Sequence, residues 1–140
     1  MFESLGQEMS LENSSNEPAR ARNCLITVID DDRSMGRMLS RIIGAAGLRV
    51  ELFTSAEDFL KSGRFSDSGC LILDVDLPGM SGLELQRHLN ESGRRIPIVF
   101  ISGQATEQTR ERALMAGAVG FFDKPFSISS LLASIQSIAA

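Results

Sequence analysis

The chain has 140 residues, of which 43% are hydrophobic, and it carries a formal net charge of −4. This length fits one domain with a core of its own, while the negative balance argues against nucleic acid or an anionic membrane surface as a partner. No segment approaches the roughly 18 apolar residues of a membrane span, and the start of the chain lacks the apolar stretch of a signal peptide. We therefore expect a cytoplasmic protein that does not interact with membranes.

The first 22 residues differ in composition from the rest of the chain. They are rich in Ser, Asn and Glu, which is typical of flexible segments. Phe2, Leu5 and Met9 have the spacing of one helical face, so a short helix that docks on a neighbour is the alternative. We predict a flexible N-terminal arm at residues 1–22 and one folded domain at residues 23–140.

Five segments of this domain have the patterns of β-strands. Unbroken apolar runs, which are typical of parallel strands covered on both faces, lie at residues 24–29, 70–73, 98–101 and 118–122. The segment 48–53 instead alternates, with Arg49 and Glu51 between apolar residues, which indicates an edge strand with one solvated face. Cys24 and Cys70 lie in or at apolar runs and are predicted to be buried thiols without a disulfide or redox role.

Helical patterns separate these strands. They comprise an apolar stripe at 35–46, N-capping sequences that begin at Ser55 and Ser81, a weakly amphipathic segment at 104–116 and an apolar face at 128–138. Because the segment 104–116 has few large apolar residues to bury, it is a candidate for a moving part.

The alternation of strands and helices predicts the fold. Five β–α units with short connections indicate an α/β domain with a doubly wound, five-stranded parallel sheet and five helices. The polar strand at 48–53 favours the flavodoxin-like strand order 2-1-3-4-5. In that order strands 1 and 3 are neighbours, and ligands bind beyond their carboxyl ends.

Polar residues at the predicted strand ends converge on that crevice. Asp30 and Asp31 end the first strand, Asp74 the third and Ser102 the fourth, while Lys124 follows the fifth. Three carboxylates repel one another unless a hard cation such as Mg²⁺ lies between them. With a positive charge and a hydroxyl donor nearby, the set suits phosphoryl transfer. Asp74 would then be the nucleophile that forms an aspartyl phosphate.

Simpler interpretations explain some of the polar residues. An acidic residue after a strand often only caps the next helix, and Asp32 is interpreted in this way. Capping does not account for polar residues at four strand ends together. His88, the only histidine, has no ligand partners nearby in the sequence and is predicted to be a partly exposed bystander.

Several segments, in this order and at family spacing, resemble the receiver domain of bacterial two-component response regulators. They are VIDDD at 28–32, LILDVDLPGMSGLEL at 71–85, VFISG at 99–103 and AGAVGFFDKPF at 116–126. The segment SAEDFL at 55–60 is similar to the nitrogen-fixation-type subfamily, whose members usually carry a C-terminal helix-turn-helix. The resemblance covers about residues 24–138, and it identifies the domain at 23–140 as a receiver (response regulatory) domain.

The resemblance implies Mg²⁺ as the cofactor. Asp30 and Asp31 would be the acidic pair, with Asp31 favoured as the direct ligand. Asp74 and the backbone carbonyl of Asp76 would complete the protein ligands. The carboxylate of Asp76 adds negative charge at the mouth of the site.

The resemblance also assigns roles in phosphorylation. Asp74 would accept the phosphoryl group, Ser102 would be the switch hydroxyl and Lys124 would bind the phosphoryl oxygens. The bond between Lys124 and Pro125 is expected to be cis. Phe121 lies where the family keeps its aromatic switch. Because it is Phe and not Tyr, it has no hydroxyl for a hydrogen bond, and only the burial of its ring can differ between the unphosphorylated and phosphorylated states.

The implied function is that of a phosphorelay response regulator. A sensor histidine kinase or a phosphotransfer protein would supply the phosphoryl group, and the surface around the fourth helix and fifth strand would change shape. The domain would not be an enzyme with a separate substrate, since it would catalyse only its own phosphorylation and dephosphorylation. We expect no DNA-binding domain and no bound nucleic acid for this chain itself, and a phosphorylation-dependent homodimer as the readout.

Two alternatives come from other functional classes. The sequence Asp74-Val75-Asp76 also fits the Asp-x-Asp of haloacid-dehalogenase-type phosphatases, but those enzymes generally need a larger chain with a cap, and an acidic pair on the first strand fits them poorly. Steady-state turnover of a phosphomonoester would favour that alternative. A pseudo-receiver that binds partners without phosphorylation is the other alternative, and the complete set of site residues argues against it.

Overall fold

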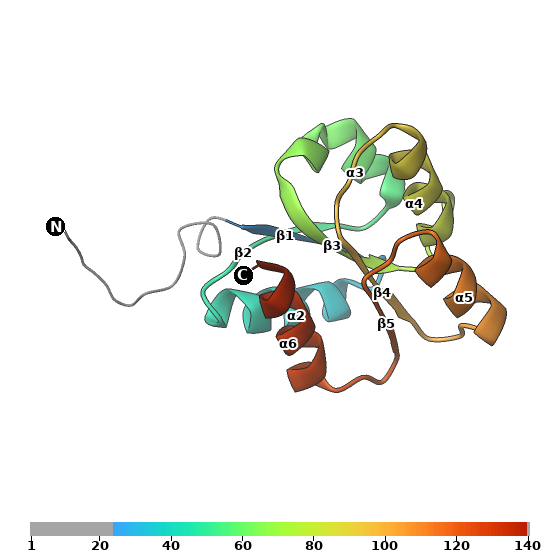
Figure 1. Cartoon of the computed structure of the whole chain (residues 1–140). Helices are drawn as coiled ribbons and strands as arrows, with labels where there is room; N and C mark the ends of the chain where they lie inside the picture. Colours follow the sequence, from blue (N-terminus) through green and yellow to red (C-terminus); the bar gives the residue numbers. More distant parts are fainter. Residues whose placement is uncertain (1–23, 140) are drawn as a thin grey trace, which may run out of the picture.

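The computed structural model describes residues 24–139, so the predicted arm at 1–22 lies outside the described residues. Strands and helices alternate along the chain (Figure 1). Their order is β1 (Leu25–Ile29), α2 (Arg33–Ala45), β2 (Arg49–Phe53), α3 (Ala56–Ser62), the 3₁₀ turn η1 (Arg64–Ser66), β3 (Ser68–Asp74), α4 (Gly82–Glu91), β4 (Ile98–Ser102), α5 (Glu107–Met115), β5 (Gly120–Asp123) and α6 (Ile128–Ala139).

The strands form one parallel sheet with the order β2-β1-β3-β4-β5. Both the predicted fold class and the predicted strand order are confirmed. The polar strand β2 lies at an edge, as its alternating sequence indicates, and β1 and β3 are neighbours. The carboxyl ends of β1, β3 and β4 therefore lie side by side.

Helices cover both faces of the sheet and enclose two hydrophobic cores. Helices α2 and α6 lie on one face, with α3, α4 and α5 on the other (Figure 1). Side chains alternate between the two cores along each central strand: Ile26 and Val28 face the α2–α6 core, whereas Ile29 faces the other core. This arrangement explains the unbroken apolar runs, because both faces of a central parallel strand are buried.

The fifth strand differs from its prediction. The apolar run at 118–122 indicates a strand covered on both faces, whereas β5 spans only Gly120–Asp123. Its place at the second edge of the sheet agrees with the predicted strand order. Its rings are only half-buried: Phe121 packs against the α3–α5 side and Phe122 against the α2–α6 side. An edge position leaves the outer flank of such a strand uncovered, and the apolar sequence of this strand gives no sign of the resulting exposure.

Side chains cap the N-termini of the helices as the sequence predicts. Asp32 caps α2 by accepting hydrogen bonds from the backbone N–H groups of Ser34 and Met35, and Ser81 with Glu84 forms a complete capping box on α4. Helix α5 buries only Ala113, in agreement with its weak amphipathicity. No helix in the described part of the chain is long and apolar enough to cross a membrane.

Candidate functional site

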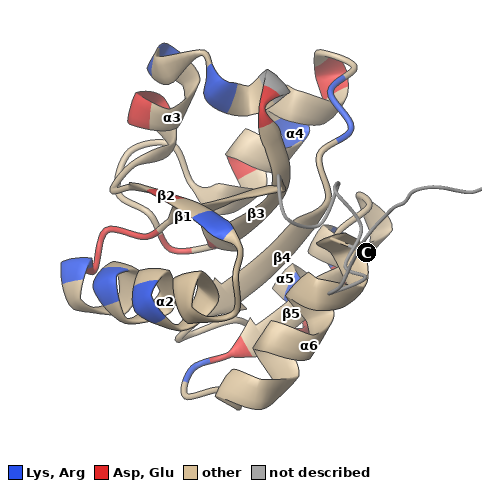
Figure 2. Ribbon diagram, turned by 90° about the vertical axis from the view of Figure 1, so that its left-hand side faces the viewer, with Lys and Arg blue, Asp and Glu red and all other residues tan. Residues whose placement is uncertain are grey.

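Three carboxylates meet where β1 and β3 end. Asp30 directly follows β1, and Asp74 is the last residue of β3. One carboxylate oxygen each of Asp30, Asp31 and Asp74 lies within 4.8 Å of the other two, and the loops that carry them lie together beside the first turn of α2 (Figure 2). Asp30 and Asp74 are buried, while Asp31 is exposed. Among residues 24–139 this is the only group of acidic, His or Cys side chains placed to hold a metal ion.

Lys124 neutralises part of this charge from the other side of the crevice. Its Nζ lies 3.2 Å from Oδ2 of Asp30 and 3.5 Å from Oδ2 of Asp74. The backbone N–H of Lys124 donates to the carbonyl of Ser102 at 2.7 Å, which fixes the residue at the end of β4. The Lys124–Pro125 peptide bond is cis. The structure thus brings together residues that lie 50 and 94 positions apart in the chain.

The environment of Asp74 opposes its ionisation. Burial raises the pKa of Asp74 to about 6, and the neighbouring Asp30 carboxylate adds to this effect. The backbone N–H of Asp76, which donates to Oδ1 of Asp74 at 3.0 Å, and the charge of Lys124 act in the opposite direction. With a pKa of about 6, Asp74 is still ionised at neutral pH, as a carboxylate whose charge is incompletely compensated.

Ser102 is oriented toward a partner that the sequence analysis did not identify. Its hydroxyl donates to Oδ2 of Asp76 at 3.0 Å and accepts from the backbone N–H of Gln104 at 3.3 Å. Ser102 is fully buried, whereas Asp76 is exposed. The resemblance places the hydroxyl in the site but contains no signal for this contact, because the two residues lie 26 positions apart.

A second contact missed by the sequence analysis holds the ring of Phe121. The guanidinium of Arg110, on α5, lies 4.8 Å from the centre of that ring, and it also pairs with Asp123 at the end of β5. Phe121 also packs against Phe100, with 5.9 Å between the centres of the two rings. Arg110 therefore links the lightly packed α5 to the strand that carries the candidate switch.

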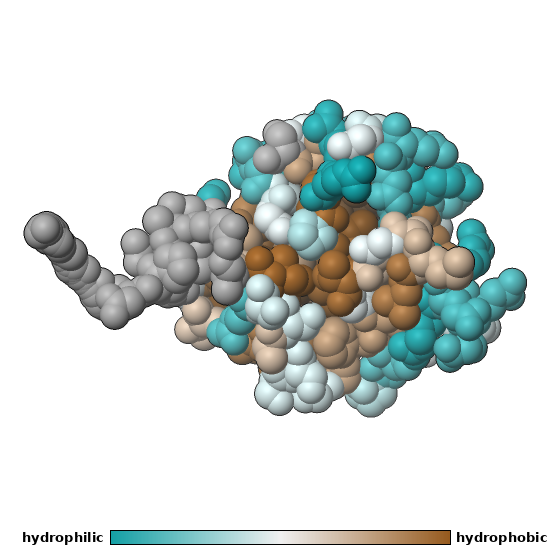
Figure 3. All heavy atoms as spheres, in the orientation of Figure 1, coloured by the Kyte–Doolittle hydropathy of each residue, from teal (hydrophilic) through white to brown (hydrophobic). Residues whose placement is uncertain are grey.

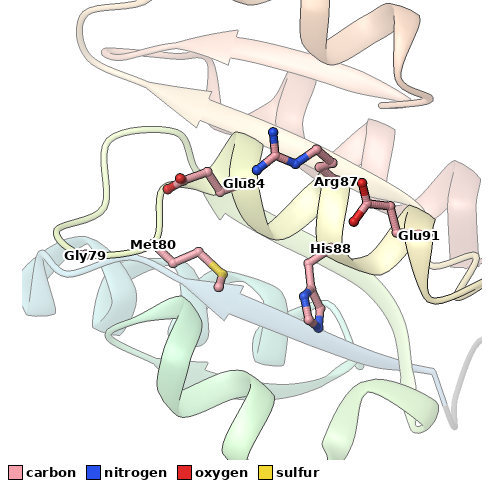
Figure 4. Close-up of a pocket in the computed structure, with 6 residues that line it drawn as sticks. All are labelled: Gly79, Met80, Glu84, Arg87, His88 and Glu91. Atoms are coloured by element: carbon pink, nitrogen blue, oxygen red, sulfur yellow. The ribbon is translucent and has the colours of Figure 1, made fainter.

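His88 lies away from the acidic crevice, as an exposed residue of α4. It borders a separate hollow of about 350 Å³ (Figure 4), together with Gly79, Met80, Glu84, Arg87 and Glu91. Among the described residues, His88 does not belong to the acidic group that could hold a metal ion.

Comparisons with known proteins place the chain in a family. The family described as "Response regulator receiver domain" matches residues 26–136. The chain belongs to this family, whose members act in two-component systems. The fold agrees with that of the response regulator StyR, whose solved structure matches with a TM-score of 0.77 and 41% identity over 82% of this chain and 58% of that chain.

Two curated relatives show where in the family it lies. The response regulator protein TodT of Pseudomonas putida is 47% identical over 116 residues, which are 83% of this chain and 51% of that protein. The transcriptional regulatory protein FixJ of Azorhizobium caulinodans is 35% identical over 112 residues, which are 80% of this chain and 53% of that protein. The chain thus spans about half the length of these relatives, and the resemblance to the nitrogen-fixation-type regulators is confirmed.

Proposed function

We propose that the chain accepts a phosphoryl group on Asp74 in a magnesium-dependent reaction, with a sensor histidine kinase or a phosphotransfer protein as the donor. The observation that carries the proposal is the cluster at the ends of β1 and β3: Asp74 is buried between the Asp30 carboxylate and Lys124 Nζ, 3.5 Å from Asp74 Oδ2. This domain would span residues 23–140, with residues 1–22 as an arm outside it.

The donor set fits Mg²⁺. All three clustered side chains offer carboxylate oxygens, which are the ligands that hard divalent cations prefer. Asp30, Asp31, Asp74 and the backbone carbonyl of Asp76 would hold the ion. When bound, Mg²⁺ would neutralise the carboxylates and the charge on the transferring phosphoryl group.

The chain's own residues supply the remaining chemistry. A carboxylate oxygen of Asp74 attacks the phosphorus, and the bond from phosphorus to the donor's histidine nitrogen breaks, so that the nitrogen leaves with the electron pair. Lys124 lies in reach of the acceptor and would stabilise the negative phosphoryl oxygens. The domain promotes this reaction on itself, and water later hydrolyses the acyl phosphate. No separate substrate is turned over.

Intact mass measurement tests this function. Incubation of the purified chain with acetyl phosphate and Mg²⁺ should add the mass of one phosphoryl group, because the site should use a small phosphodonor without a kinase. Chelation of Mg²⁺ should prevent the gain. Equal labelling with and without chelator would contradict a magnesium-dependent site, and continuous release of phosphate from a phosphomonoester would favour the phosphatase alternative.

The acidic pair gives a second prediction. Replacing Asp30 and Asp31 together by Asn should weaken Mg²⁺ binding and slow phosphorylation, since two of the ligands lose their charge. In the metal-free protein the same change should raise the melting temperature by a few degrees, because it relieves repulsion around Asp74. Thermal scans with and without Mg²⁺ measure both effects. A pair with only a structural role would lose stability and leave metal affinity unchanged.

The readout is proposed to be a homodimer formed through α5, β5 and the adjoining α6. Helix α5 exposes Leu114 and Met115, and the connection just before β5 exposes Val119; they are 45%, 89% and 53% accessible. The face in Figure 3 carries hydrophobic residues across its middle, at the level of β5 and α6 in Figure 1. Exposed apolar residues gathered on one face are typical of protein–protein contact surfaces.

A third prediction follows from this readout. The beryllofluoride-bound protein should self-associate more strongly than the free protein, by a factor that corresponds to about 1–3 kcal/mol of coupling. Phe121→Ala should reduce the difference, because the ring lies between Arg110 of α5 and the core. Light scattering over a concentration series measures both. Identical association constants in the two states would show that the readout is a different partner.

A further inference from the structure

The hydroxyl of Ser102 is already engaged in the unphosphorylated protein. A serine hydroxyl has one proton to donate, and here it is donated to Oδ2 of Asp76 rather than to Asp74. The backbone N–H of Gln104 donates to the Ser102 hydroxyl oxygen, so the hydroxyl is oriented from both sides. Lys124, in contrast, already points at the acceptor, with Nζ 3.5 Å from Asp74 Oδ2. Of the two side chains expected to bind the phosphoryl group, only Lys124 is therefore in position.

The loop from β3 to α4 holds Asp76 in place for this contact. Its neighbours Val75 and Leu77 are buried, and its own backbone N–H is bonded to Oδ1 of Asp74. Later in the same loop, the backbone N–H of Met80 donates a hydrogen bond to the carboxylate of Glu57, on α3, at 2.8 Å. The backbone of Asp76 is thus fixed, while its carboxylate is exposed. A hydrogen bond between a buried hydroxyl and an exposed carboxylate can be broken at modest cost, because water can solvate the carboxylate.

We propose that Asp76 is a positioning residue, which acts through Ser102 as a latch on the unphosphorylated state. A phosphoryl group on Asp74 must compete with the Asp76 carboxylate for the single proton of the Ser102 hydroxyl. The latch thereby weakens the response to phosphorylation and keeps the β4–α5 loop in its resting conformation through Gln104. This inference rests on the proposed function, since it assumes that an anion binds at Asp74.

In a single Asp76 mutant, the loss of the carboxylate's charge alone would have a similar effect on anion binding. The Asp76 carboxylate repels any anion at Asp74, so its removal tightens anion binding even without a latch. The latch differs because it depends on the Ser102 hydroxyl. A double-mutant cycle between Asp76 and Ser102 separates the two effects.

The cycle is measured as beryllofluoride affinity in the presence of Mg²⁺, by calorimetry on the full chain. In the protein that keeps Ser102, Asp76→Ala should tighten beryllofluoride binding by about tenfold. This is the effect expected from the loss of a competing hydrogen bond to a charged group. In the Ser102→Ala background the same change should tighten it by less than about threefold. Asp76→Asn, which keeps an acceptor oxygen but loses the charge, should tighten binding less than Asp76→Ala. Equal factors in both backgrounds would overturn the latch in favour of plain repulsion.

A second measurement does not depend on phosphoryl chemistry. In the metal-free protein, Asp76→Ala should lower the urea midpoint more in the Ser102 background than in the Ser102→Ala background, because only the former loses the hydrogen bond. Equal shifts, with normal beryllofluoride binding, would overturn the latch alone. If no variant binds beryllofluoride, both the proposed function and the competition at Asp74 are wrong.

Discussion

Asp74→Asn is expected to make the metal-free protein more stable at pH 7.5, by about 2–3 kcal/mol. Burial raises the pKa of Asp74 to about 6, from an ordinary value of 3.8. The ionised carboxylate therefore opposes folding by an amount that corresponds to roughly two pKa units. Asn has the same shape and carries no charge, so this cost disappears.

The raised pKa of Asp74 also determines how the free energy of unfolding of the metal-free protein depends on pH. Below about pH 4 the carboxyl is protonated in both the folded and the unfolded state, and it has no effect on the free energy of unfolding. Between about pH 4 and 6 the folded state binds the proton more tightly, so metal-free stability should fall as pH rises through this window and stay low above it. Urea unfolding from pH 4 to 8 measures the slope. If the free energy of unfolding of the wild type instead rose with pH relative to that of Asp74→Asn, the raised pKa of Asp74 would be wrong.

Lys124→Ala is expected to have the second large effect. Its Nζ contacts both buried carboxylates, and although burial lowers the pKa of Lys124, Asp30 and Asp74 raise it overall. Without this cation the pair is left uncompensated, which should cost about 1–3 kcal/mol at pH 7.5, since the side chain is partly exposed. Phosphorylation by acetyl phosphate should slow by about a hundredfold.

The other lysine of the chain supplies the control for this variant. Lys61 is an exposed residue of α3, so Lys61→Ala should change neither the free energy of unfolding nor the phosphorylation rate appreciably. Urea unfolding and intact mass against time measure the two properties. Similar behaviour of the two lysine variants would show that Lys124 has no special role at the acidic cluster.

Much of the fold follows from local patterns. Apolar runs of strand length, helical stripes and capping residues such as Ser81 depend on near neighbours in the chain, and they determine the element order. The alternating strand at 48–53 also placed β2 at the sheet edge, and with it the order of the sheet. The predicted order also places β5 at the other edge, but its apolar sequence did not show that its rings would be only half-buried there.

The site was predictable to the extent that topology alone brings it together. In a parallel sheet the strand ends meet at one edge, so the meeting of Asp30, Asp74 and Lys124 follows from strand order. The hydrogen bond from Ser102 to Asp76 and the stacking of Arg110 on Phe121 do not follow from it. Such contacts depend on how loops turn and on side-chain orientations, for which the sequence carries no periodic signal.

Direct location of the phosphoryl group tests the central claim. The chain is phosphorylated with acetyl phosphate and Mg²⁺, and then reduced with borohydride, which converts an aspartyl phosphate to homoserine. Peptide sequencing by mass spectrometry then identifies the converted residue. We expect conversion at Asp74 alone, and no conversion anywhere in Asp74→Asn. Conversion at Asp30, Asp31 or Asp76 in the wild-type protein, or a phosphoryl group on His88, would contradict it.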